Sequence, residues 1–455
     1  MGVRKKSLKP TAILLISFLL LTVGAGSFSP TLAQTDNLTL PIIKKDSLLN
    51  GLQLITLEKP GSGEVSIKVR IKSGAVFDLV GKGGLADLTA GMLLRGGGGY
   101  SFKTVEEVVE QSAIRINIKT GWDYTSLEFS GPKDATETIF DLMSRLIISP
   151  AFDQKEFDSL KAERLAAIKS ATNDRLLIDL KAVESLYGTH PYGKLPQGTS
   201  DSLAKITKAD LSYFHSKFYL ANNAVLIAAG DLSAEEVTKL TRTKLGAWKK
   251  GDLVAPSFRA PDSLTGRRVF LIDRPEATVA QMVIAQSGFS RRSTDFLAAV
   301  LMMELYKEQI AKLCQQNCSV EYSQRLLNGP ILINIQSSPT ELTTRVEQLT
   351  KLITTMQSSQ PEAESVERVK TELIQMMNEK LKNNPAEILF DIDSYGLGKD
   401  YLVTFIERVK AITPSDIQKA AKAYLTGSNN LIVVAAPVKA YEMEWKKLGE
   451  FTVMP

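Results

Sequence analysis

The sequence predicts an α+β protein built from two homologous domains, each an antiparallel-rich mixed sheet with helices packed on one face. Three observations lead to this prediction. Segments in which apolar residues alternate recur along the chain, and amphipathic helical segments lie between them. Residues 206–233 also resemble residues 412–439, at an offset of about 206 residues. The length of 455 residues accommodates two copies of one such unit.

The first copy begins with a strand-rich region. Residues 52–59 alternate and lead into the turn Pro-Gly-Ser-Gly, and apolar alternation within residues 64–78 predicts a half-buried strand. A helix is expected to begin at Thr104, because Glu107 three residues later completes the pattern of a capping box. Residues 114–131 then predict a β-hairpin.

Helices and a central strand complete the first copy. Residues 134–150 predict an amphipathic helix that Pro150 ends, and residues 153–172 predict a long charged helix. Residues 209–219 predict a helix directly before the apolar segment 222–230. That segment lacks a polar face, so we expect it near the middle of the sheet.

The domain boundaries follow from the repeat. We assign residues 40–250 to the first domain and residues 262–455 to the second. Residues 251–261 between them are polar and contain prolines, as expected of a linker.

The N-terminal 33 residues predict a secretory signal peptide. A basic start precedes an apolar run over residues 12–25, and small or polar residues follow up to Ala33. An uncleaved anchor is the alternative, and it would be the only membrane attachment. Without this segment 51 Lys and Arg face 50 Asp and Glu, so nucleic acid is not an expected partner. We expect an exported protein of the bacterial periplasm or cell envelope.

Two cysteines, Cys314 and Cys318, are the only ones in the chain. Export would expose them to oxidants, and a local disulfide is then possible. The spacing strains such a bond unless a helix ends there, so two free thiols remain the alternative.

Residues 81–97, GKGGLADLTAGMLLRGG, resemble the zinc helix of the pitrilysin/insulinase-type (M16) peptidases. In that family an inverted zinc motif, H-x-x-E-H, lies between a Gly-Leu-Ala entry and a Met-Leu-x-x-Gly exit. Residues 188–233, residues 274–288 and the segment KKLGEF near the C-terminus also match family patterns. The resemblance covers roughly residues 49–451 and implies two M16-type α+β halves.

The resemblance implies that the zinc chemistry is lost. The first metal histidine falls at Asp87, the water-activating glutamate at Ala90 and the second metal histidine at Gly91. These positions share one face of a helix. A catalytic zinc needs three protein ligands and an open position, and one carboxylate does not supply them.

The remaining positions agree with this interpretation. The family's third metal ligand falls at or near Ala167, and its supporting acid falls near Leu160. Glu163 lies one turn from Ala167, so a register error would restore one ligand but not the set. His190 and His215 are the only histidines, and structural or surface roles are expected for both. We therefore predict no catalytic residue, no metal and no cofactor, with zinc only in a partner chain.

A substrate-binding pair is a second expectation from the resemblance. Zinc-less family members often hold the peptide backbone with an Arg and a Tyr in the second domain. Tyr322 is the candidate tyrosine, while Arg325 comes after it instead of before. Lys307 and Lys312 are the cations that precede it, and lysine does not reproduce a bidentate guanidinium. A sheet edge offers peptide another route, by strand addition.

The resemblance thus implies an inactive homologue of an M16 zinc endopeptidase. It is similar to the zinc-less subunit of bacterial heterodimeric M16 proteases and to processing-peptidase-like proteins. The expected role is to close a chamber and bind unfolded peptide for a homologous zinc-bearing chain. The alternative is a stand-alone peptide-binding or assembly protein of the envelope. Displaced enzyme chemistry is disfavoured, because the sequence contains no G-x-S-x-G and no histidine pair at ligand spacing.

Overall fold

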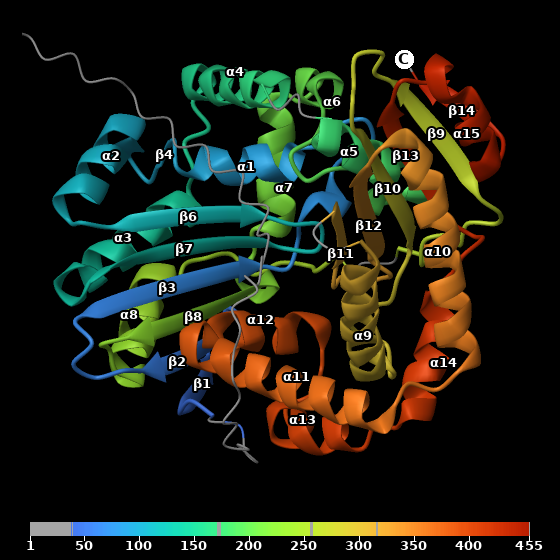
Figure 1. The fold of residues 1–455 in the computed structure, drawn as a ribbon. Helices are drawn as coiled ribbons and strands as arrows, with labels where there is room; N and C mark the ends of the chain where they lie inside the picture. Colours follow the sequence, from blue (N-terminus) through green and yellow to red (C-terminus); the bar gives the residue numbers. More distant parts are fainter. Residues whose placement is uncertain (1–37, 39, 171–173, 255–257, 315–316, 455) are drawn as a thin grey trace, which may run out of the picture. The chain divides into compact units, whose positions relative to one another are not determined.

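The computed structural model describes residues 38, 40–170, 174–254, 258–314 and 317–454 (Figure 1). The predicted signal peptide and residues 255–257 of the predicted linker lie outside the described residues. Within the described ranges, no helix combines the length and apolarity that crossing a membrane requires.

Two six-stranded mixed sheets form the framework. The first has the strand order β1-β2-β8-β3-β7-β6, and the second has the order β11-β12-β10-β13-β9-β14. The strands of the first sheet are β1 (Ile43–Ser47), β2 (Gln53–Glu58), β3 (Glu64–Ile71), β6 (Arg115–Thr120), β7 (Thr125–Pro132) and β8 (Ala224–Gly230). Those of the second are β9 (Arg268–Asp273), β10 (Ala280–Ser287), β11 (Cys318–Tyr322), β12 (Pro330–Ser337), β13 (Leu431–Ala436) and β14 (Phe451–Met454).

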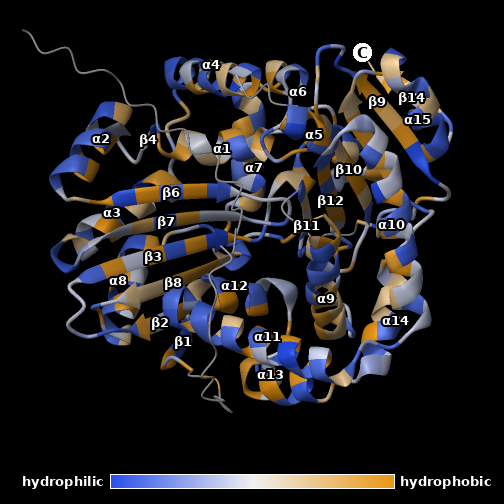
Figure 2. Cartoon of the chain, viewed as in Figure 1, coloured by the Kyte–Doolittle hydropathy of each residue, from blue (hydrophilic) through white to orange (hydrophobic). Residues whose placement is uncertain are grey.

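Apart from the outer strands β1 and β14, the two sheets repeat one topology, as the internal repeat predicts. In the first sheet β8 pairs parallel with β2 and antiparallel with β3, and in the second β13 pairs parallel with β9 and antiparallel with β10. The hairpins β6–β7 and β11–β12 then extend each sheet on the corresponding side. The predicted fold class is confirmed. Figure 2 shows hydrophobic residues along β8 and β12, inside the two sheets.

Helices connect the strands in both halves. The first half contains α1 (Leu85–Leu93), α2 (Phe102–Gln111), α3 (Thr136–Ile148), α4 (Gln154–Ser170), α5 (Asp174–Tyr187), α6 (Ser200–Ala204), α7 (Lys208–Phe218) and α8 (Ala234–Leu245). The second contains α9 (Phe296–Cys314), α10 (Pro339–Ser358), α11 (Ala363–Asn383), α12 (Pro385–Tyr395), α13 (Tyr401–Lys410), α14 (Pro414–Tyr424) and α15 (Glu442–Leu448).

Strand β3 shows how the sequence pattern sets the two faces of the first sheet. Val65, Ile67, Val69 and Ile71 are almost wholly buried, and they join one core with α1, α3, α7 and α8. The intervening side chains point to the other face, because successive residues of a strand alternate. That second face carries Arg70, which is nevertheless fully buried.

Each half covers part of the other half's sheet. Helix α5 packs on β10 and β13 through a core that contains Ile178 and Val433. Helix α12 packs beside β8, and a core that includes Ile227 and Phe390 continues into the second half (Figure 1). Each sheet is therefore covered on one face by helices of its own half and on the other face by a helix of the opposite half.

The start of α2 differs from the prediction. The helix begins at Phe102, two residues before Thr104, and Ser101 is its N-cap, with Oγ accepting a hydrogen bond from the Thr104 N–H at 3.2 Å. Thr104 and Glu107 therefore lie inside the helix and do not form the predicted capping box. Ser101 is equally suited to capping, which is why the sequence pattern was ambiguous.

Candidate functional site

Helix α1, the predicted degenerate zinc helix, is held by packing. Leu85, Leu88 and Met92 are completely buried in the first core. Its N-terminus is fixed by Asp78, whose carboxylate accepts hydrogen bonds from the N–H groups of Gly84 at 2.7 Å and Ala86 at 2.8 Å. Burial raises the pKa of Asp78 to about 7, although these two hydrogen bonds oppose the shift. The helix thus keeps its place without any metal.

An arginine from α4 occupies the side of α1 that the family's zinc motif would use. Arg164 Nε lies 3.1 Å from Asp87 Oδ2, and both side chains are largely buried. Burial raises the pKa of Asp87, and the charge of Arg164 opposes that shift. Asp87 therefore has a partner already, and the positive guanidinium would repel a cation brought to this carboxylate.

The neighbouring positions offer no ligand atoms. Ala90 is completely buried, and Ala167 on α4 carries only a methyl group. A Cβ placed on Gly91 would lie 3.0 Å from Leu160 Cδ2 and 3.6 Å from Arg164 Nη2. The space that a histidine side chain would need is thus filled by the side chains of α4.

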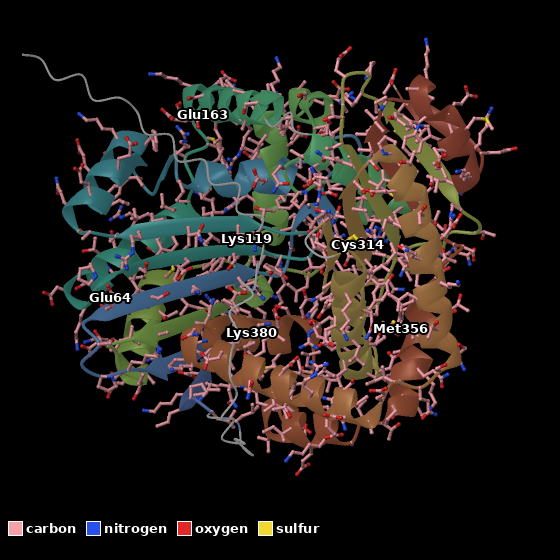
Figure 3. The ribbon with its side chains drawn as sticks, in the orientation of Figure 1. Glu64, Lys119, Glu163, Cys314, Met356 and Lys380 are labelled. Carbon is pink, nitrogen blue, oxygen red and sulfur yellow. A yellow bond between two sulfur atoms is a disulfide. The ribbon has the colours of Figure 1, made fainter. Side chains whose placement is uncertain are left out.

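Glu163 does not replace a metal ligand. Its Oε2 accepts a hydrogen bond from Arg95 Nη2 at 2.7 Å, and its Oε1 accepts one from Ser159 Oγ at 3.2 Å. Figure 3 labels Glu163 on α4. Arg164, one residue later, is the side chain that reaches Asp87. The structure therefore does not adopt the register of α4 in which Glu163 would replace a metal ligand.

The donor set at this position does not fit zinc. One carboxylate in an ion pair, two alanines and a glycine cannot provide the three protein ligands of a catalytic zinc site. Throughout the described ranges, no group of three or more His, Cys, Asp and Glu side chains is arranged to hold a metal ion. No catalytic step through a metal can be derived from these residues.

Both histidines are bound to backbone groups. His215 Nε2 lies 2.7 Å from the carbonyl oxygen of Ile147, and burial lowers its pKa. His190 Nδ1 accepts a hydrogen bond from the Tyr192 N–H at 3.1 Å, and its Nε2 lies 3.0 Å from the Arg259 carbonyl oxygen. A carbonyl only accepts, so Nε2 carries the proton in each contact. These geometries are those of structural side chains.

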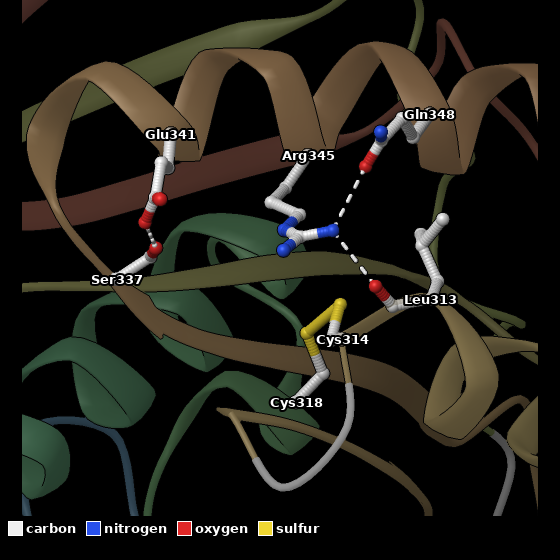
Figure 4. Close-up of a disulfide and its surroundings, with 7 residues drawn as sticks. All are labelled: Leu313, Cys314, Cys318, Ser337, Glu341, Arg345 and Gln348. Carbon is white, nitrogen blue, oxygen red and sulfur yellow. Dashed lines mark hydrogen bonds between the residues drawn. A yellow bond between two sulfur atoms is a disulfide. The ribbon is translucent and has the colours of Figure 1, made fainter.

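The two cysteines are joined in the structure. Cys314 is the last residue of α9 and Cys318 is the first of β11, and their Cα atoms are 5.5 Å apart (Figure 4). The helix end removes the strain that continued helical geometry would impose. Next to the bond, Arg345 Nη1 donates hydrogen bonds to the Leu313 carbonyl at 2.7 Å and to Gln348 Oε1 at 3.1 Å.

Tyr322 and Arg325 are not presented together to a peptide. The Tyr322 ring packs 5.5 Å from the ring of Phe289 and 4.9 Å from Lys307 Nζ. Its hydroxyl lies 3.5 Å from Glu304 Oε1. Arg325 is only 3% exposed, and its guanidinium faces a different set of aromatic rings. These positions do not support the predicted role of the pair in binding peptide.

Arg325 instead lies buried in the contact between the two halves. Its guanidinium lies 3.5 Å from the ring centroid of Trp122 and 4.8 Å from that of Tyr192. Asp123 completes the contact by accepting hydrogen bonds from the Tyr192 hydroxyl at 2.6 Å and from the Leu326 N–H at 2.8 Å. Among the residues that the structure describes, the guanidinium's Nε and Nη1 have no hydrogen-bond partner, and burial lowers its pKa.

A second contact between the halves centres on Arg70. From β3 it pairs with Glu387 at 2.6 Å and Asp391 at 3.1 Å, both on α12. Its guanidinium also lies 3.8 Å from the ring centroid of Tyr124 and 4.3 Å from that of Phe390. The sequence analysis did not identify Arg70. The feature that could have revealed it is a cation within a strand whose apolar residues otherwise alternate.

Comparison with known proteins decides the family. Residues 53–187 match the family profile "Insulinase (Peptidase family M16)", and residues 205–373 match the profile "Peptidase M16 inactive domain". The chain belongs to peptidase family M16. The first match lies within the first half of the M16 chain and includes the altered positions on α1 and α4, while the second begins near the end of the first half and extends into the second.

Relatives of this M16 chain include both peptidase subunits and inactive homologues. It is 25% identical over 286 residues to the probable mitochondrial-processing peptidase subunit beta of Arabidopsis thaliana, covering 61% of this chain and 52% of that protein. It is 24% identical over 258 residues to the non-peptidase homolog YmxG of Helicobacter pylori, covering 56% and 57%. The matched region thus spans about half the length of these relatives.

The M16 chain also shares its fold with solved structures. The peptidase M16 inactive domain from Pseudomonas fluorescens superposes with a TM-score of 0.77 at 21% identity. That match covers 87% of this chain and 98% of the other.

Proposed function

We propose that this chain is the non-catalytic subunit of an exported M16 peptidase. In this role it closes the chamber and binds peptide for a homologous chain that carries zinc. The ion pair between Asp87 and Arg164 carries the proposal. It fills the position expected for the metal with groups that neither bind a metal ion nor activate water. Two relatives support it by name, one as a subunit of a processing peptidase and the other as a non-peptidase homologue.

The edge of the first sheet offers a place for peptide. Strand β6 is the last strand of that sheet, and its neighbour within the described residues is β7. It also contacts α1, so a peptide added along β6 would run past the altered metal position. Strand addition uses backbone hydrogen bonds and requires no catalytic residue.

A reconstitution assay tests the proposal. The purified chain should contain no stoichiometric zinc and should not hydrolyse an unfolded peptide alone. It should raise the activity of a homologous chain that carries H-x-x-E-H, recovered with it from the native host. Peptide hydrolysis by the isolated chain that a chelator abolishes would contradict the proposal. Recovery of unrelated envelope proteins only would favour a stand-alone binding protein.

A second measurement tests the route of peptide binding. A peptide with N-methyl groups at alternate residues cannot donate the backbone hydrogen bonds that strand addition needs. It should bind about tenfold more weakly than the unmodified peptide. The same peptide methylated at the intervening residues is the matched control, because its donors on the pairing side remain. Equal binding of all three peptides would exclude the strand route.

A further inference from the structure

A basic cavity in the second half is separate from the altered metal position. It has a volume of about 490 Å³ and lies between the loop after β10, the start of α9 and the helices α12 and α13. Three arginines line it, together with hydroxyl and apolar groups, and no carboxylate is among the described residues of its wall. The arginines are Arg291, Arg292 and Arg408.

Arg291 is the buried element of this cavity. It is 7% exposed, its Nη2 donates a hydrogen bond to the Tyr401 hydroxyl at 3.0 Å, and its guanidinium lies 4.1 Å from the Phe296 ring centroid. Its Nε has no hydrogen-bond partner among the described residues. Asp391 interacts with Arg291 electrostatically, but its Oδ1 accepts the hydrogen bond of Arg70. A buried guanidinium with an unused donor favours an anionic ligand.

Two helices begin at the cavity and add to its positive potential. Helix α9 starts at Phe296 and helix α13 starts at Tyr401, and both residues line the cavity. The N–H groups of Phe296 and Tyr401 are bonded to the carbonyls of Ser293 and Gly398, so each helix start acts on an anion through its dipole. Ser293 and Thr294, just before α9, also line the cavity and bring hydroxyl donors.

The internal repeat shows how the second half differs in charge from the first half at this cavity. In the first half, Asp78 follows Gly74 by four residues, and its carboxylate caps the helix that comes next. In the second half the residue four positions after Gly288, which corresponds to Gly74, is Arg292. The carboxylate of the first half is thus replaced by a cation. An external anion would place a negative charge beside Arg292, in addition to that of Asp295, which directly precedes α9 and accepts a hydrogen bond from the Tyr424 hydroxyl at 2.8 Å.

We propose that this cavity binds an oxyanion, either a phosphate group or the carboxylate of a peptide end. The guanidinium groups of Arg291, Arg292 and Arg408 pair with its oxygens, and the hydroxyl groups of Ser293 and Thr294 supply further donors. The inference does not depend on the proposed partner chain, because every group that it invokes belongs to the second half.

Calorimetric titration of the full chain at constant ionic strength tests this site. The probes are inorganic phosphate, a short peptide with a free C-terminus and the same peptide with an amidated C-terminus. Saturable binding of phosphate, or of the free peptide but not of the amide, is the expected result and identifies the source of the oxyanion. Failure of both phosphate and the free peptide to bind saturably would overturn the proposal.

A pair of arginine variants localises the binding. Arg292→Ala and Arg408→Ala alter exposed side chains at the cavity, and each should weaken binding about tenfold. The matched control is Arg368→Ala, which removes an arginine of α11 that pairs with Glu308 outside this cavity. Binding that is unchanged by the first two substitutions, or weakened equally by the third, would show that the anion binds elsewhere.

Discussion

Asp87 on α1 and Arg164 on α4 form an ion pair, with Nε and Oδ2 3.1 Å apart, on the helix face where the family resemblance expects metal ligands. This face of α1 therefore differs from the expected zinc motif by more than the absence of ligands. Arg164 supplies a positive charge at this position, and the Asp87 carboxylate is paired with it. This pair links α4 to α1, two helices that are in contact.

Restoring the ligands alone should not restore zinc binding. We expect the combined variant Asp87→His, Ala90→Glu, Gly91→His and Ala167→Glu to purify with almost no zinc. Arg164 would still place its charge beside the new histidines, and a side chain on Gly91 would crowd Leu160. Adding Arg164→Ala should raise the zinc content toward one equivalent, measured by elemental analysis after dialysis.

The control for this graft replaces a neighbouring arginine. Arg95 pairs with Glu156 and Glu163 on the same helix α4 but does not contact Asp87. Adding Arg95→Ala to the four substitutions should leave the zinc content low. If the four substitutions bound zinc fully with Arg164 present, the guanidinium would not be what excludes the metal.

Breaking the pair should destabilise the chain more than removing it. Arg164→Ala leaves a buried carboxylate without a partner, and we expect the free energy of unfolding to fall by about 1–3 kcal/mol. Asp87→Ala together with Arg164→Ala should recover part of that loss, because no charge is then left uncompensated. Urea denaturation of both single variants and the double variant gives the coupling. Strictly additive effects would mean that the pair does not act as a unit.

The arrangement of the positions on α1 was predictable from the sequence. Asp87, Ala90 and Gly91 follow a fixed spacing within one helix, so their shared face could be assigned without a structure. Arg164 was not identified, although it lies one helical turn before Ala167 and one after Leu160. The sequence showed that these positions share a stripe of α4, but not that the stripe faces α1. That orientation depends on long-range packing.

The fold was predictable to a similar extent. The internal repeat predicted two matching sheets, and local alternation identified strands such as β3. The exchange of α5 and α12 between the halves was not predicted, because local periodicity does not say which sheet a helix will cover. Arg70 illustrates the difficulty, since a cation on the outward face of a strand usually indicates solvent, yet here it is covered by α12.

Arg70 should hold the two halves together. Arg70→Ala would leave Asp391 without its ion-pair partner, and we expect a loss of about 3–5 kcal/mol in the free energy of unfolding. Hydrogen exchange should also quicken in α12, because the helix loses both of its ion pairs with Arg70 of β3. The control Lys44→Ala breaks the exposed pair with Glu58 and should cost about 1 kcal/mol or less. Equal losses in the two variants would assign Arg70 no special role.

Asp78 should make stability depend on pH. Its pKa is raised from 3.8 to about 7, chiefly by burial, so between these values the folded chain holds a proton that the unfolded chain releases. The stabilisation is complete below 3.8 and is lost as the pH rises through about 7. One pKa unit corresponds to about 1.4 kcal/mol, so the change across this window is on the order of 4 kcal/mol.

Asp78→Asn removes this titration. The stability of the wild-type chain minus that of the variant should therefore decrease from pH 4 to pH 7.5, and subtraction cancels the contributions of His190 and His215. A constant difference for Asp78→Asn would mean that Asp78 caps α1 as an ordinary ionised carboxylate.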